Sequence, residues 1–158
     1  MRKRIGTAAA VALLAVMLGG VVRGATAAPA TVDLDLLMPN DELVIEVLDF
    51  NRPGLRLGDR LVARAPLYDI TGTQRLGRAF LECVVVSNRL ANTAGLFRCS
   101  YLLDLAEGDI LVEGLDPAGT GSYTMAIYGG TDAYRLAAGD ADFVDTPDGT
   151  EMHLRLEV

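Results

Sequence analysis

An alternation of apolar and polar residues with a period of two constrains the fold of this chain more than any other feature. At the C-terminus, Met152, Leu154, Leu156 and Val158 alternate with polar residues, as in a β-strand with one buried and one solvated face. Similar runs cover residues 43–50, 60–68, 78–87, 95–103, 109–114, 121–128 and 135–143. No long amphipathic helix accompanies them. The sequence therefore predicts an all-β protein with eight short strands.

Turn-forming residues separate these runs, for example Gly129-Gly130 and Pro147 to Gly149. Eight antiparallel strands in one small domain are enough for a sheet to close into a barrel. A β-sandwich is the competing architecture. Gly139, inside a strand pattern, favours the barrel because a tightly curved strand accommodates a residue without a side chain. Residues 31–40 fit either an arm along the barrel or an extra edge strand.

The N-terminus has the layout of a secretory signal peptide. Basic residues at positions 2–4 precede an uncharged apolar run over 7–22, and small residues follow. The run is shorter than the roughly 20 residues that span a bilayer comfortably. We expect cleavage after Ala27 or Ala30, with an uncleaved signal anchor as the alternative. The chain then divides into a signal peptide, 1–30, and one domain, 31–158, and we expect a secreted, extracellular protein.

The mature chain is strongly acidic. The formal net charge is −7, and loss of Arg2, Lys3, Arg4 and Arg23 with the leader lowers it to −11. Such a surface repels phosphate backbones and anionic lipid headgroups. Nucleic acid and membrane surfaces are therefore poor partners, and no stable membrane insertion is expected after signal cleavage.

Cys83 and Cys99 are the cysteines of the chain. An even number of cysteines in an exported protein favours a disulfide. If the strands around them form a hairpin, the two residues face each other on the same side of the sheet. Two buried free thiols are the alternative. A metal pair is disfavoured because the single histidine, His153, is distant in sequence.

Few residues are suited to catalysis. His153 lies on the polar face of the terminal strand, where a solvated role is expected. The acidic residues over 140–151 lack the spacing of a calcium loop, and no glycine-rich phosphate loop opens a helix. We expect no metal and no cofactor, and whether the protein is an enzyme stays open.

Glu46, in the segment ELVIEVLDF, is the candidate for acid–base chemistry, with two orientations open. If Glu46 faces the barrel interior, its carboxylate has apolar surroundings, a raised pKa and the ability to exchange protons near neutrality. If Leu43, Ile45 and Val47 point inward instead, Glu46 lies outside in water.

Aromatic residues provide candidates for ligand binding, because tyrosine combines a large apolar face with a hydroxyl group. Tyr68 and Tyr128 are placed at strand ends, where a barrel mouth would lie. Phe50 and Tyr101 are further candidates, with barrel core as the alternative role. Arg64 either reaches into the cavity or lies outside with its stem on apolar surface.

Residues 123–143, YTMAIYGGTDAYRLAAGDADF, resemble the GGTGxYxxAxG signature of the allene oxide cyclase and dirigent proteins. Asp132 replaces the third glycine, and the residues at matching positions are Gly129, Gly130, Thr131, Tyr134, Ala138 and Gly139. Residues 54–69, 76–86 and 108–114 are similar to other segments of this family in the same order. The chain thus resembles an exported actinobacterial member of the family.

The resemblance implies a calycin-type, eight-stranded antiparallel barrel with a hydrophobic cavity, and homo-oligomers such as dimers or trimers. It assigns the catalytic glutamate of the plant cyclases to Glu46. Other polar residues of that site correspond to Leu48, Ala65 and Asp116. These differences favour a retained barrel with changed chemistry.

Three functions follow as alternatives. The first is a cyclase or isomerase that acts without a cofactor and holds a hydrophobic small molecule in a reactive geometry. The second is a non-catalytic carrier or scavenger of a lipophilic ligand. The third is a dirigent-like guide of a coupling reaction.

Overall fold

Nine β-strands make up the fold of the computed structural model, which describes residues 30–48, 56–87 and 95–157. The elements are β1 (Thr31–Pro39), η1 (Asn40–Glu42), β2 (Val44–Leu48), β3 (Arg60–Asp69), β4 (Arg75–Ser87), β5 (Leu96–Leu105), β6 (Gly108–Pro117), β7 (Ser122–Gly130), η2 (Asp132–Tyr134), β8 (Ala138–Asp145) and β9 (Gly149–Glu157), where η denotes a 3-10 helix. None of the helices in these described segments is long and apolar enough to cross a membrane.

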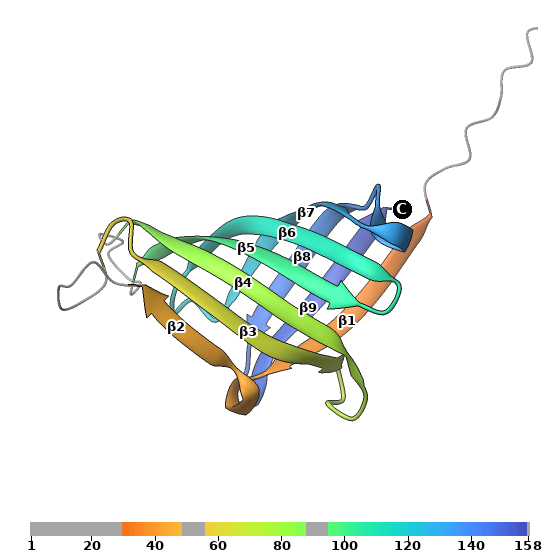
Figure 1. The fold of residues 1–158 in the computed structure, drawn as a ribbon, viewed down its shortest axis with the longest axis horizontal. Helices are drawn as coiled ribbons and strands as arrows, with labels where there is room; N and C mark the ends of the chain where they lie inside the picture. Colours follow the sequence, from red (N-terminus) through yellow and green to blue (C-terminus); the bar gives the residue numbers. More distant parts are fainter. Residues whose placement is uncertain (1–29, 49–55, 88–94, 158) are drawn as a thin grey trace, which may run out of the picture.

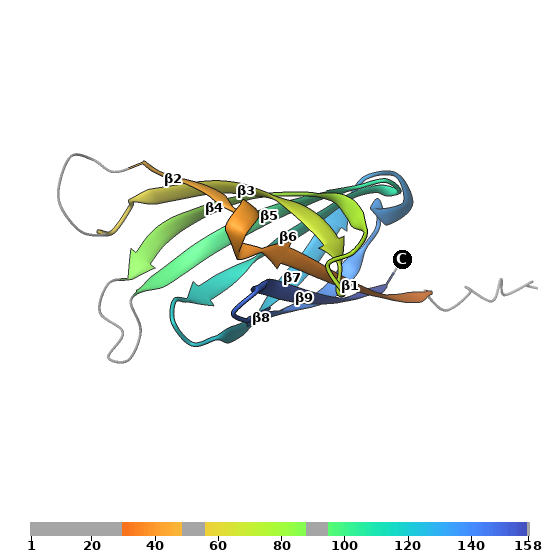
Figure 2. The same ribbon diagram turned by 90° about the horizontal axis from the view of Figure 1, so that it is seen from below.

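The sheet closes on itself into an antiparallel barrel (Figures 1 and 2). Hydrogen bonds join the strands in the order β1-β9-β8-β7-β6-β5-β4-β3-β2. A further pairing joins β1 to β3 at Leu36–Asp69 and Leu37–Tyr68. This pairing makes a ring of eight strands, a number whose interior side chains can fill. The predicted all-β, eight-stranded barrel is confirmed.

The identity of the barrel strands corrects one part of the prediction. Residues 31–40, which fitted an arm or an edge strand, contain the barrel strand β1, and β1 pairs with β9 along its whole length. The run over 43–50 contains β2, which pairs with β3 outside the ring. The exchange of roles between β1 and β2 arises after Pro39, where β1 ends and η1 turns the chain from the edge of β9 to the edge of β3.

The start of β8 also differs from the prediction. The alternation places a strand over 135–143, whereas β8 begins at Ala138. The preceding residues form η2, in which Asp132 has a φ of 45°, a left-handed value that glycine adopts more easily. Tyr134 and Ala137 pack against the core. Residues 131–137, here named the cap segment, therefore cover this end of the barrel (Figure 1).

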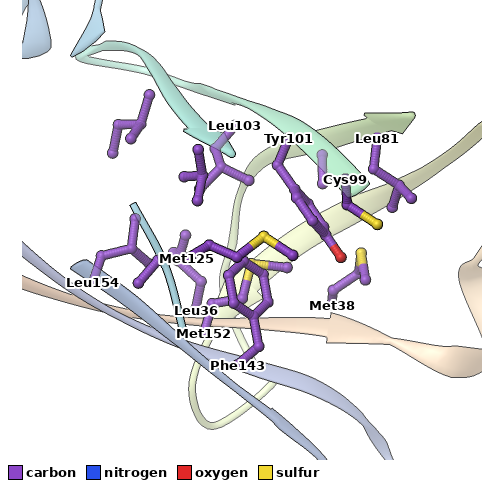
Figure 3. Close-up of a cluster of buried hydrophobic side chains, with 14 of the residues drawn as sticks. Leu36, Met38, Leu81, Cys99, Tyr101, Leu103, Met125, Phe143, Met152 and Leu154 are labelled. Atoms are coloured by element: carbon purple, nitrogen blue, oxygen red, sulfur yellow. The ribbon is translucent and has the colours of Figure 1, made fainter. Parts of the chain in front are cut away.

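Apolar side chains fill the barrel interior next to the cap segment. Each strand contributes alternate residues to it, as the period of two requires. Figure 3 shows several of them converging from facing strands. The largest fully buried side chains are Phe143, Leu36, Leu67, Leu103, Ile110, Met152, Leu154, Leu156, Val112 and Cys99.

Cys83 and Cys99 form the predicted disulfide. They lie directly opposite each other on β4 and β5, with 4.1 Å between their Cα atoms and 2.06 Å between their sulfur atoms. Both side chains are buried on the inner face. The bond thus joins neighbouring strands from inside the barrel.

Replacing both cysteines, in a Cys83→Ala/Cys99→Ala variant, should lower the free energy of unfolding by about 3 kcal/mol, because the unfolded chain loses a cross-link. Urea unfolding of the oxidised protein and the variant measures the change. The wild type unfolded with a reductant is the control and should approach the variant. Equal stability of the oxidised wild type and the variant would contradict the prediction.

The replacement Gly139→Ala should destabilise the barrel severely. Gly139 has a φ of 147°, and a Cβ atom there would collide with the Arg155 carbonyl oxygen on β9. We expect a loss above about 3 kcal/mol. Gly119→Ala is the matched control, because Gly119 also has a positive φ (84°) but open space around it. That variant should lose about 1 kcal/mol, and equal losses would show that the close approach to β9 is unimportant.

Candidate functional site

The barrel end opposite the cap segment holds polar and aromatic side chains on its inner face. We name it the open end: β4, β6 and β8 finish there, and β3, β5, β7 and β9 begin there. Inward-facing residues are less buried here than near the cap segment. Tyr123 and Asp116 are half-buried, and Asp145 is exposed.

Three aromatic rings form a layer just below this end. The rings of Tyr123 and Phe143 stack with centroids 5.0 Å apart and planes 10° apart. The Tyr101 ring lies 4.9 Å from Phe143 at a tilt of 40°, and Figure 3 shows it reaching from β5 toward Phe143. The Tyr101 and Tyr123 hydroxyl oxygens are 3.2 Å apart. One hydroxyl donates to the other, so one O–H proton of the pair remains for another acceptor.

Asp116 places a carboxyl group next to this aromatic layer. It lies opposite the buried Phe97, and cross-strand partners share a face of the sheet. Burial, and then the negative charge of Asp145, raise the pKa of Asp116 to about 6. Asp145 accepts a hydrogen bond of 3.2 Å from the hydroxyl of the buried Thr150.

Both tyrosines stay neutral at physiological pH. Burial raises the pKa of Tyr101 to about 12, although its hydrogen bond with Tyr123 acts in the opposite direction. Burial also raises the pKa of Tyr123, and Tyr101 adds to the effect. The open end thus combines a carboxyl group that titrates near neutrality with fixed phenol donors. Such a set can donate and accept protons.

An apolar wall faces part of the same space. Ile45 and Val47 of β2 pair with Ala63 and Leu61 of β3, so they lie on the inner face. Their side chains are nevertheless 49% and 52% exposed. The inner surface at this end therefore has an apolar side, on β2 and β3, and a polar side, on β6 to β9.

Glu46 lies on the outer face of β2, opposite the outward-facing Val62. It borders a shallow surface groove with Val44, Arg64 and Phe80. Of the two orientations that the sequence left open, the structure contains the one with Ile45 and Val47 inward and Glu46 in water.

The other candidates from the sequence are scattered. Tyr101 is inside the barrel, whereas Arg64 is exposed on the outer face and Tyr128 is 55% exposed there. The Tyr68 hydroxyl donates to Glu42 at 3.0 Å and lines an external groove of about 530 Å³. Phe50 lies outside the described residues. The structure does not bring these residues together into one site.

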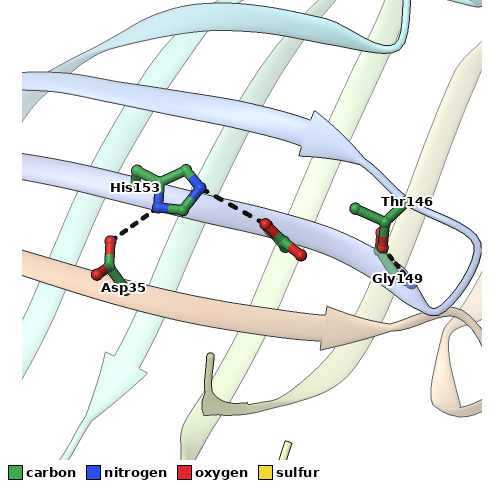
Figure 4. A network of polar contacts seen from close by, with 5 residues as sticks. Asp35, Thr146, Gly149 and His153 are labelled. Atoms are coloured by element: carbon green, nitrogen blue, oxygen red, sulfur yellow. Dashed lines mark hydrogen bonds and ion pairs between the residues drawn. The ribbon is translucent and has the colours of Figure 1, made fainter. Parts of the chain in front are cut away.

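His153 lies on the outer face, as the sequence predicted. Its Nδ1 atom is 2.8 Å from Asp35 Oδ1, and its Nε2 atom is 3.6 Å from Glu151 Oε2 (Figure 4). Across the segments 30–48, 56–87 and 95–157, no three His, Cys, Asp or Glu side chains gather in a way that could hold a metal ion.

The sequence-based candidates missed Asp116 and Asp145 as a pair. The alternation of inward and outward residues along their strands was the signal that could have identified them. Asp116 continues the inward positions Ile110 and Val112, and Asp145 continues the inward position Phe143. The acidic stretch around Asp145 suggested solvent instead, and the resemblance placed Asp116 at a polar position of the plant cyclase site without giving it a role.

Asp116→Asn should change the pH dependence of stability. The fold raises the pKa of Asp116, so its stabilising contribution is complete below its unfolded pKa and is lost as pH rises from about 4 to about 6. Relative to wild type, the variant should therefore gain about 1 to 2 kcal/mol between about pH 4 and pH 8, after allowance for partial exposure. Urea unfolding across this range tests it, with the outer-face variant Asp33→Asn as the control. A pH-independent difference would contradict the assignment.

No protein-family model and no curated protein matches this chain. Several solved structures share its fold. A pyocyanin demethylase is 27% identical, with a TM-score of 0.66 over 79% of this chain and 99% of the other. The Diels–Alderase AbmU from Streptomyces koyangensis is 16% identical, with a TM-score of 0.62 over 86% and 72%.

A third similar structure is the pterocarpan synthase dirigent protein GePTS1. It is 18% identical, with a TM-score of 0.59 over 80% of this chain and 83% of the other. This chain therefore has the barrel fold that proteins of the cyclase and dirigent types also use.

Proposed function

We propose that the open end of the barrel binds a hydrophobic small molecule and rearranges it, as a cyclase or isomerase of the allene oxide cyclase-like type. The observation that carries this proposal is the carboxyl group of Asp116. It is half-buried next to two neutral tyrosines and has a pKa near the pH at which an enzyme works. General acid–base catalysts are most effective when their pKa lies near the operating pH.

Each residue has a defined role in such a reaction. In its ionised form Asp116 removes a proton from one carbon of the ligand, and the protonated carboxyl returns a proton to another carbon. The Tyr123 hydroxyl, held by Tyr101, donates a hydrogen bond to an oxygen on which negative charge develops. The reaction conserves atoms and electrons, so it needs no oxidant or reductant.

The assignment moves the acid–base role from Glu46 to Asp116. The resemblance to the plant cyclases pointed to Glu46, but this side chain is on the outer face of β2. Asp116 lies on the inner face beside Phe97. In our proposal the protein shares the barrel of the plant cyclases, but its acid–base carboxyl group comes from β6 instead of β2.

The similar structures support a reaction on a small molecule. The 27% identical neighbour is named for a demethylation, and AbmU for a Diels–Alder reaction. The dirigent neighbour is a pterocarpan synthase. We further propose that the protein acts outside the cytoplasm, because its disulfide is stable in an oxidising compartment.

The test begins with native mass spectrometry of the protein purified from the culture medium of its host, to identify compounds that copurify. A compound found in this way is then incubated with the protein. A cyclase or isomerase should change its chromatographic retention and leave its mass unchanged. A compound that is bound and released unaltered would reject catalysis and favour the carrier.

Variants locate the chemistry. Asp116→Asn should slow the conversion by at least about a hundredfold, because it removes the acid–base group. Tyr123→Phe should slow it by a smaller factor, because one hydrogen-bond donor is lost. Glu46→Gln is the matched control on the outer face and should react like wild type. Loss of activity in Glu46→Gln with full activity in Asp116→Asn would overturn the assignment.

A further inference from the structure

The charges on the inner face of the open end are all negative among the described residues. The inward positions at this end are Met38, Leu61, Val85, Phe97, Asp116, Tyr123, Asp145 and Thr150. Asp116 and Asp145 are the charged members of this set; the buried Asp59, just before β3, accepts a hydrogen bond from the Arg56 backbone N–H instead. Any bound ligand therefore meets two carboxyl groups, two neutral phenols and apolar surface.

Basic side chains in the described segments do not balance these carboxyl groups. Arginine residues pair with acids on the outer face, in the pairs Arg60–Glu82, Arg78–Asp104, Arg98–Glu113 and Arg155–Asp142. No ion pair involves Asp116 or Asp145 within the described part of the chain. Burying an unpaired carboxyl group is unfavourable, and a ligand with positive charge would offset this cost.

The aromatic layer defines the shape of the ligand. Tyr123 is stacked on Phe143 and is less buried than that ring. Phe97 lies directly across from Asp116 on the neighbouring strand. A flat ring bound at the open end can thus contact aromatic surface and a carboxyl group at once, and cations are attracted to the faces of such rings.

The apolar wall supplies a place for the rest of the ligand. Ile45 and Val47 face inward but remain about half exposed. They belong to β2, which pairs with β3 and lies on the opposite side of the barrel from β8 and β9 (Figure 2). A ligand with a charged ring and an uncharged apolar part would cover both sides.

Resting on the proposed function of this same site, we propose that the ligand is a flat aromatic cation or an aromatic weak base that binds with a positive charge, and that carboxylates and phosphates are excluded. The ring lies at Tyr123 with its charge toward Asp116 and Asp145, and its apolar part lies on β2. The two carboxyl groups therefore select the ligand by charge, and Asp116 in addition transfers protons.

Three probes that share one ring system test this charge preference. They are the cation N-methylacridinium, neutral acridine and the anion acridine carboxylate. Equilibrium dialysis at about pH 8, where Asp116 is ionised, and at ~0.15 M salt, where distant charges are screened, gives the three affinities. We expect the cation to bind at least about tenfold more tightly than the anion, with acridine between them.

The variant Asp116→Asn/Asp145→Asn should lower the affinity for N-methylacridinium about tenfold and the affinity for acridine, which carries no fixed charge, by a smaller factor. Asp33→Asn removes one negative charge from the outer face of β1 and should alter neither of these two affinities. Circular dichroism and thermal unfolding establish that each variant is folded. If the double variant is unfolded, Asp145→Asn alone serves, with the same direction expected and a smaller change.

The outcomes separate this inference from the proposed function. Tighter binding of acridine carboxylate, or a cation preference that survives in the folded variant, would overturn the charge preference and leave a ligand site intact. If none of the three probes binds to the wild type, the ligand site itself is rejected, and the proposed function with it.

Discussion

The short pairing of β1 with β3 is the contact on which the rest of the structure depends. It joins the ends of an eight-stranded sheet at Leu36–Asp69 and Leu37–Tyr68 and so covers part of two edges, which could otherwise pair with other chains. Once the sheet is closed, each strand has an inside and an outside. The role of every residue then follows from its place in the alternation: Leu36 and Leu67 become core, and Glu46 becomes surface.

Much of this arrangement was visible in the sequence. The alternation predicted the all-β class and most strands, and the placement of Cys83 and Cys99 predicted a direct cross-strand disulfide. The sequence placed a barrel strand at residues 43–50 and left residues 31–40 as an arm or an edge strand, because both segments are apolar and alternating and the pattern does not distinguish a barrel strand from an extra one. The choice depends on which edge the chain follows after Pro39, a long-range pairing with no local signal. The sequence also placed residues 135–137 in a strand, although they belong to the cap segment. It gave no sign of η2, because Asp132 adopts a backbone conformation expected of glycine.

The candidate site was harder to predict than the fold. Carboxylates are rarely buried without a partner, so sequence patterns favour solvent for Asp116 and Asp145. The half-buried position of Asp116, with Asp145 close enough to influence it, emerges only when the strands are wound into a barrel and their ends converge. The raised pKa of Asp116 follows from the same geometry, because burial and a neighbouring carboxylate both disfavour its ionised form. The raised pKa on which the proposed proton transfer depends therefore also weakens the folded state above that pKa.

The cap segment has a consequence for the traffic of molecules through the barrel. Tyr134 and Ala137 pack against the core at one end, and the fully buried side chains next to them fill the interior. A compound bound among the rings at the open end, as we propose, would therefore enter and leave the barrel through that same end. If the proposed reaction takes place there, product and substrate compete for one binding site, and each turnover waits for the previous product to leave. If that product left slowly, the barrel would also store it.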